Sequence, residues 1–157
     1  MSGDPRYMAV QGAAVIAAAA VTTLGVLGFI PAATLGLDQL VWAGQRSGAM
    51  LFGIFTVSVV QNALHLATGA AGFLMARSYA GARAYLLAGG AIYLGLWLYG
   101  VLVERGSSAH VLPLNPADQV LHLVLGGVMT LLAVTLAGQR DPTKHPPRIS
   151  GEGTRLT

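Results

Sequence analysis

Two histidines in long uncharged stretches are the side chains best suited to chemistry in this sequence. His65 and His122 lie 57 positions apart (65 and 122), and the residues around each read polar-polar-x-Leu-His-Leu-x-x-Gly. In a helix, residues at i, i+3 and i+7 share a face. Each copy of the motif would therefore place three such residues on one face: Asn62, His65 and Gly69 in the first, Gln119, His122 and Gly126 in the second.

Three kinds of chemistry fit such a pair. Two facing imidazoles could bind haem b, as in helical bundles with a cofactor between helices. Together with Asn62 and Gln119 they could line a proton-linked or small-molecule site, because ionisable groups inside a membrane are functional candidates. The interpretation we favour is structural: this buried polar face forms hydrogen bonds between helices, and we predict no bound cofactor or metal.

Depth in the membrane argues against haem. His65 lies twelve residues before Arg77 (77 minus 65) and His122 lies eighteen before Arg140 (140 minus 122). If each arginine marks the inner end of its span, the imidazoles differ in depth by about 9 Å at 1.5 Å per residue. Haem b held by His65 and His122 remains an alternative.

Four apolar stretches must position these residues. Hydrophobic residues make up 54% of the sequence and charged residues 10%, far from the balance of a soluble domain. A helix needs about 20 apolar residues to cross a bilayer, and the stretches that qualify are 8–30, 52–76, 84–103 and 117–138. They predict an all-α integral membrane four-helix bundle over residues 1–138, arranged as two helix hairpins in a parallel pseudo-repeat, since both histidine motifs lie in spans of the same direction.

The basic residues predict the orientation. Arg6, Arg77, Arg83 and four basic residues of the tail 139–157 fall on one side, against Arg46 and Arg105 on the other. Short cytoplasmic segments collect Lys and Arg, so we expect both termini in the cytoplasm and a multi-pass protein of the inner (plasma) membrane. The basic, proline-rich tail suits lipid headgroups and not nucleic acid.

The sequence shows no combination of residues typical of a catalytic site. There are no cysteines, and the acids between residues 8 and 138, Asp38, Glu104 and Asp118, fall in or beside expected outer loops, where Asp118 reads as a first-turn helix residue. His110 and His145 are expected to be solvated loop side chains. We therefore predict a non-enzymatic protein.

Small residues predict how the helices pack. Gly69, Gly72 and Gly126 would let neighbouring helices approach closely. The function these features favour is an accessory or structural subunit that packs against itself as a homo-oligomer or against a larger membrane complex, with the lipid bilayer as its other partner.

Several of these segments resemble one known family. They include Gln61-Asn62-Ala63-Leu64-His65-Leu66 and Asn115-Pro116-Ala117-Asp118 within the longer stretches 55–66, 82–87, 93–100 and 113–122, with 27–31 similar to the end of a first span. Together they resemble DUF4383, a family of small bacterial multi-pass membrane proteins of unknown function. The resemblance implies a four-helix membrane domain and no known activity or cofactor. Members often carry a histidine where this sequence has Gln61, which weakens any proposal that needs three histidines.

Overall fold

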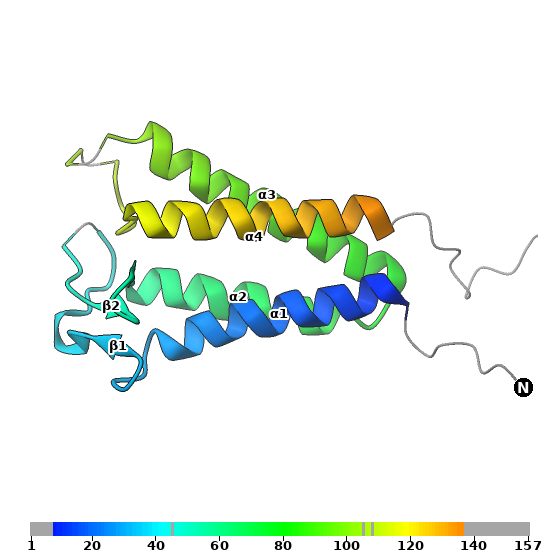
Figure 1. Ribbon diagram of the computed structural model, residues 1–157, viewed down its shortest axis with the longest axis horizontal. Coiled ribbons are helices and arrows are strands. Elements are labelled where there is room, and N and C mark those ends of the chain that lie inside the picture. Colours follow the sequence, from blue (N-terminus) through cyan, green and yellow to red (C-terminus); the bar gives the residue numbers. More distant parts are fainter. Residues whose placement is uncertain (1–7, 45, 105, 108, 137–157) are drawn as a thin grey trace, which may run out of the picture.

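The computed structural model describes residues 8–44, 46–104, 106–107 and 109–136 and is dominated by four helices (Figure 1). In chain order the elements are α1 (Ala9–Leu27), β1 (Thr34–Leu35), the short 3-10 helix η1 (Leu37–Gln39), β2 (Met50–Leu51), β3 (Phe55–Thr56), α2 (Val59–Met75), α3 (Tyr79–Leu102) and α4 (Pro116–Thr135). The tail 139–157 lies outside the described residues, as does Arg6.

The helices run side by side, and the strands gather at one end of them (Figure 1). We call this the sheet end. At the opposite end, which we call the connection end, residues 76–78 join α2 to α3. Helices α1 and α3 run toward the sheet end, whereas α2 and α4 run away from it.

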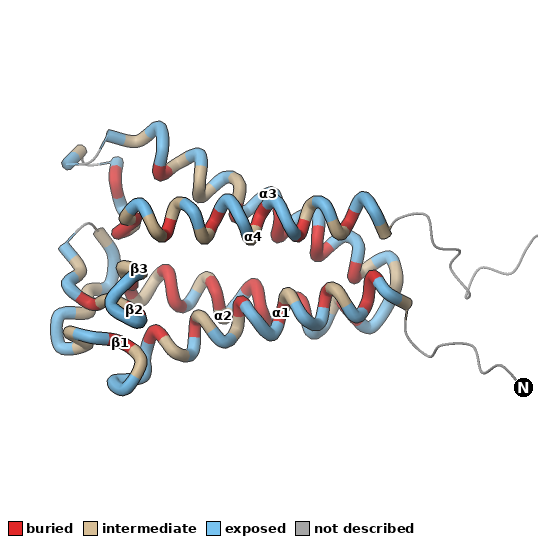
Figure 2. Tube along the Cα trace, viewed as in Figure 1, coloured by how far each residue is buried: buried red, intermediate tan, exposed pale blue. Residues whose placement is uncertain are grey.

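Three of the described helices are long and apolar enough to cross a membrane, namely α1, α3 and α4. Helix α2 has 17 residues and is the shortest of the four. Buried residues lie mainly on the faces between helices (Figure 2). Large apolar side chains such as Ile16 and Leu131 are exposed. Apolar exterior faces on hydrogen-bonded helices are what a hydrocarbon solvent requires. The structure thus indicates a membrane protein through three candidate spans, and it confirms the prediction of four helices, although α2 is not among those candidates.

Glycines set the distance between helices within each hairpin. Helix α1 packs mainly on α2, and α3 mainly on α4. A Cβ added to Gly126 of α4 would lie 2.7 Å from the backbone N of Leu94 and 2.9 Å from the carbonyl O of Gly90, both in α3. Gly69 of α2 similarly faces Thr22 and Ala18 of α1. These glycines therefore serve close packing between helices of the same chain.

The predicted second span, 52–76, is wrong at its start. Phe52 and Gly53 have positive φ (53° and 69°) and form the turn between β2 and β3, which pair antiparallel. Helix α2 begins only at Val59. Ser58 is its N-cap, and the Ser58 hydroxyl accepts a hydrogen bond from the N–H of Gln61. An apolar run alone does not distinguish a short buried strand from a helix, so the loop residues were assigned to the span.

The third span also begins earlier than predicted, at Tyr79 and not at residue 84. Ser78 caps it by accepting from the N–H of Gly81 at 3.1 Å. Arg83 consequently lies inside the helix, four residues after Tyr79 (83 minus 79).

The sheet end has a small core of its own. Strand β2 pairs with β1 and β3, with Leu51 opposite Thr34 on one side and Phe55 on the other. Leu51 is buried with Ala49 and Val57 against the end of α1. This small core holds strand β3 beside the start of α4.

Candidate functional site

His65 and His122 meet between the two hairpins. Each follows the first residue of its helix by six positions (59 to 65 and 116 to 122), so both lie at the same distance from the sheet end. Their ring centroids are 6.1 Å apart, with the ring planes tilted by 47°. The predicted depth difference of about 9 Å is therefore wrong. The estimate rested on Arg140, which lies outside the described residues, and α4 is a longer helix than α2.

Tyr93 of α3 completes a cluster of three rings. Its ring centroid is 5.8 Å from those of both His65 and His122, at interplanar angles of 21° and 27°. The Tyr93 hydroxyl is 2.9 Å from Oγ1 of Thr68, and the Thr68 hydroxyl lies 2.8 Å from the carbonyl O of Leu64. A threonine hydroxyl has one proton, so Thr68 donates to the carbonyl and accepts from Tyr93. The tyrosine is thereby fixed against both imidazoles.

The ring cluster forms one polar layer between the hairpins. A second polar layer, formed by Gln61 and Asp118, lies one helical turn closer to the sheet end. Asp118 is completely buried, and its Oδ2 accepts from the backbone N–H groups of Asn115 (2.9 Å) and Thr56 (3.2 Å). The side chain of Gln61 also interacts with this carboxyl. Gln61 and Asp118 occupy the same position in the two copies of the repeat, as His65 and His122 do. Equivalent residues thus face each other in both layers, and Asp118 connects α4 to the strand β3 of the other hairpin.

Several polar atoms in these layers have unused hydrogen-bonding capacity. Among the described residues, the buried atoms without a partner include Nε2 of His65, both ring nitrogens of His122, Oδ1 of Asp118 and Oε1 of Gln61. Buried polar atoms are normally hydrogen-bonded. Within the same residues, no group of three or more His, Cys, Asp or Glu could hold a metal ion. The cluster is therefore the candidate site, with imidazoles as its available groups.

Asn62 and Gln119 lie apart from the histidines. Asn62 is buried against Gly28 at the end of α1. Gln119 is only half-buried, and its Nε2 donates to the carbonyl O of Gly100 in α3 at 2.8 Å. The predicted polar face is therefore divided: the histidines join the two hairpins, and each amide contacts the first helix of its own hairpin.

Sequence reasoning missed Tyr93 and the pairing of Gln61 with Asp118. The repeat contained the signal for the second, because positions 61 and 118 correspond. Asp118 was expected only as a first-turn residue, and that role is present: Asn115 Oδ1 accepts from its N–H at 2.9 Å. Tyr93 is the tyrosine near the middle of α3, far from the interfaces where tyrosines gather.

His110 contradicts its prediction as a solvated side chain. It is 5% exposed, and its ring lies 5.9 Å from that of Tyr99 at an interplanar angle of 16°. The Tyr99 hydroxyl donates to the carbonyl O of Ala109 and accepts from the N–H of Val111, which fixes the loop on either side. Tyr99 of α3 thus shields the His110 ring from solvent. The position of His110 in a loop gave no sign of this contact.

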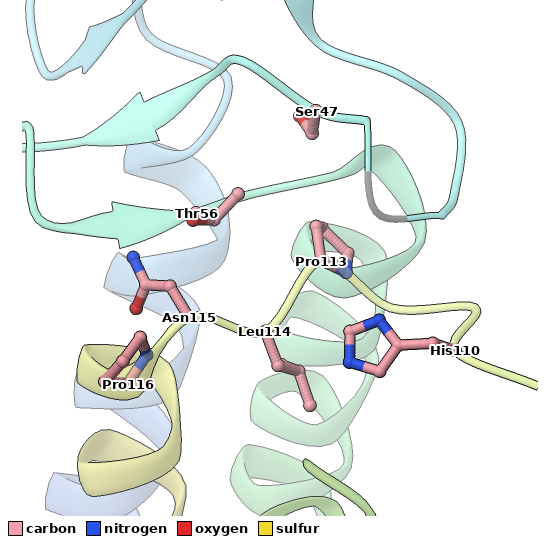
Figure 3. A pocket seen from close by; sticks show the side chains of 7 residues that line it. All are labelled: Ser47, Thr56, His110, Pro113, Leu114, Asn115 and Pro116. Atoms are coloured by element: carbon pink, nitrogen blue, oxygen red, sulfur yellow. The ribbon is translucent and has the colours of Figure 1, made fainter. Parts of the chain in front are cut away.

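A polar pocket of about 250 Å³ opens beside His110 at the sheet end (Figure 3). Both ring nitrogens of His110 are buried without a partner. The side chains that line this pocket are Ser47, Thr56, His110, Pro113, Leu114, Asn115 and Pro116.

Comparison with known proteins identifies a family for this chain and no individual relative. No curated protein and no solved structure matches it. A family model described as "Domain of unknown function (DUF4383)" matches residues 11–135, which include nearly all of the four helices and both histidine motifs. The resemblance found in the motifs is confirmed, and the chain belongs to the DUF4383 family.

Proposed function

We propose that this chain is a non-enzymatic membrane protein, an accessory or structural subunit that packs against itself or a larger complex. The observation that carries the proposal is the closure of the ring cluster. His65 is 3% exposed, and Tyr93 and His122 are 0% exposed. A substrate needs a concave site that reaches the reacting groups, so the cluster is better suited to hold two hairpins together than to turn over a ligand.

The proposed arrangement is a four-helix bundle in the plasma membrane with both termini in the cytoplasm. Helix α2 runs beside α1, and its 17 residues are at the lower limit of about 17–25 for a crossing helix. Arg77 and Arg83 at the connection end support placing that end inside. The sheet end would then face outward.

Contacts with a partner helix would use glycines that the chain does not use itself. A Cβ added to Gly12, Gly95 or Gly127 would meet nothing within 4 Å, unlike one at Gly69, Gly72 or Gly126. All three free glycines are exposed. Small residues on a lipid-facing surface let another helix approach its backbone.

Native-mass analysis after gentle solubilisation tests the assignment. The chain should migrate as a homo-oligomer or within a larger complex, and Gly127→Leu should reduce that fraction while the control Val134→Leu, also on the exposed face of α4, should not. A chain that migrates as a monomer under every mild condition contradicts the proposal.

A second candidate is a ligand-binding or proton-linked site at His65 and His122, favoured by their unpartnered ring nitrogens. Haem b would have to displace Tyr93, whose ring stacks on both imidazoles. Visible spectra of the purified protein, oxidised and then reduced, decide the haem case through the Soret band. For a proton-linked transporter, flux in proteoliposomes should disappear when His65→Ala and His122→Ala are combined.

A further inference from the structure

A row of hollows follows α4 from its first residue to Leu132. The first is the polar pocket of Figure 3 at the sheet end. The second, about 440 Å³, lies between β3 and α4 and is lined by Ile54, Phe55, Ala117, Val120, Leu121 and Val124. The third, about 290 Å³, lies between α1 and α4, with Ala13, Ala17 and Ala20 facing Val124, Val128 and Leu132.

The two apolar hollows share one lining residue, and the polar pocket borders the second hollow at the junction of β3 and α4 without sharing a residue with it. Val124 lines both apolar hollows, so they meet at its side chain. Asn115 lines the polar pocket, and its Nδ2 donates at 2.7 Å to the carbonyl O of Ile54, which lines the second hollow. The surface along α4 therefore changes from polar at the sheet end to apolar toward the connection end.

The length of the apolar part suits one hydrocarbon chain. Ala117 and Leu132 are fifteen residues apart (132 minus 117), which is about 22 Å along a helix at 1.5 Å per residue. One leaflet contributes about half of the roughly 30 Å hydrocarbon core. An acyl chain whose head lies in the polar pocket can thus run its whole length in this groove.

The polar pocket indicates which head would fit. Its polar lining consists of the uncharged side chains Ser47, Thr56 and Asn115 together with His110. The Ser47 hydroxyl donates to the carbonyl O of Val57, so its oxygen is left as an acceptor. The two unpartnered nitrogens of His110, a residue 5% exposed, supply one donor and one acceptor when the ring is neutral. Hydroxyl groups match this set, whereas a buried phosphate would need a cation, and the described residues of the lining include no Lys or Arg.

We propose that the groove along α4 binds a lipid with an uncharged, hydroxyl-bearing head, with the head in the polar pocket and one acyl chain along β3, α1 and α4. This goes beyond the subunit role and does not depend on it. A partner helix would fill the apolar part but would leave the polar pocket without an occupant.

Photolabelling of the full chain in nanodiscs tests the site. The probe is a monoacylglycerol with a diazirine in its acyl chain, and labelled peptides should come from β3 and α4. Val124→Trp should lower labelling about tenfold, because the indole ring would occupy part of the groove. Several methylene groups of the acyl chain would then lose their contacts with the protein. Val124 is 53% exposed, so the larger side chain fits outside the core. Val128→Trp serves as a second blocking variant, and Leu123→Trp, on α4 but outside the groove lining, is the control.

The head is tested separately. Thr56→Val removes a hydroxyl but keeps the backbone N–H that bonds Asp118, and it should weaken competition by unlabelled monooleoylglycerol about five-fold, the effect of one lost hydrogen bond. Phosphatidylglycerol should compete much less well than monooleoylglycerol. Equal labelling of the blocking and control variants overturns the site, and equal competition by phosphatidylglycerol overturns the uncharged head.

Discussion

At the scale of single residues, Tyr93 and Asp118 make the contacts on which the join between hairpins depends. Tyr93 comes from α3 and touches a histidine of each hairpin. Asp118 comes from α4 and accepts from a strand of the other hairpin. Neither contact is local in sequence, so substitutions at the two residues should affect stability without any ligand present.

Tyr93 can be divided into its hydroxyl and its ring. Tyr93→Phe keeps the stacking and removes one hydrogen bond to Thr68, so it should lower the free energy of unfolding by about 0.5–1.5 kcal/mol. Tyr93→Ala removes the whole buried ring and should cost about 3–5 kcal/mol. Denaturant unfolding in a fixed detergent measures both. Equal costs for the two variants would mean that the ring contacts contribute nothing.

Asp118 should behave as a structural acceptor. Asp118→Ala leaves the N–H groups of Asn115 and Thr56 without their acceptor, at a cost of about 1–3 kcal/mol for each buried group. Asp118→Asn keeps an oxygen and should cost less. Asp38, exposed at the sheet end, is the matched control, and Asp38→Ala should stay within about 0.5 kcal/mol of the parent chain. Thermal unfolding of detergent-solubilised variants gives the order.

At the scale of elements, caps and glycines decide where the helices begin and how closely they pack. Ser58, Ser78 and Asn115 each accept a backbone N–H three residues ahead, and these three bonds start α2, α3 and α4. The cap of α4 was evident from sequence because Asn-Pro with a following acid is a specific signal. The serine caps were not recognised, since Ser58 lies within an apolar run and Ser78 lies in the segment between the second and third predicted spans.

Adjacent glycines of α4 should respond oppositely to the same change. Gly126→Ala places a Cβ 2.7 Å from the backbone of α3 and should destabilise the second hairpin by about 1–3 kcal/mol. Gly127→Ala meets nothing within 4 Å and should stabilise α4 by about 0.5–1 kcal/mol, because alanine loses less backbone entropy on folding. Unfolding midpoints of the two variants supply the comparison. Similar shifts for both would contradict the close backbone approach at Gly126.

At the scale of the whole molecule, the two hairpins meet through equivalent positions of the repeat. Gln61 faces Asp118, and His65 faces His122. Such pairing is expected when two similar units are related by an approximate twofold axis between α2 and α4. Tyr93 departs from this symmetry, since it comes from only one hairpin yet contacts both histidines.

Orientation is a property of the whole molecule that labelling can test, because the native sequence has no cysteine. Ala43→Cys lies between η1 and β2 at the sheet end, and Ala80→Cys lies in the first turn of α3 near the connection end; both positions are exposed. With the connection end in the cytoplasm, as the arginines predict, a membrane-impermeant maleimide should label Ala43→Cys in intact cells and Ala80→Cys only after lysis. The reverse pattern would invert the topology.

The sequence by itself determined the number of helices, the repeat and the family, because each depends on local patterns: apolar length, polar spacing and motif residues. It also identified His65 and His122 as the residues at the centre of the candidate site. Only the tertiary structure decided that the two histidines lie at one depth, that Tyr93 lies between α2 and α4, that Asp118 reaches the other hairpin and that His110 is buried. Those facts depend on how two hairpins are placed against each other, and packing between segments distant in the chain leaves no periodic trace in either segment.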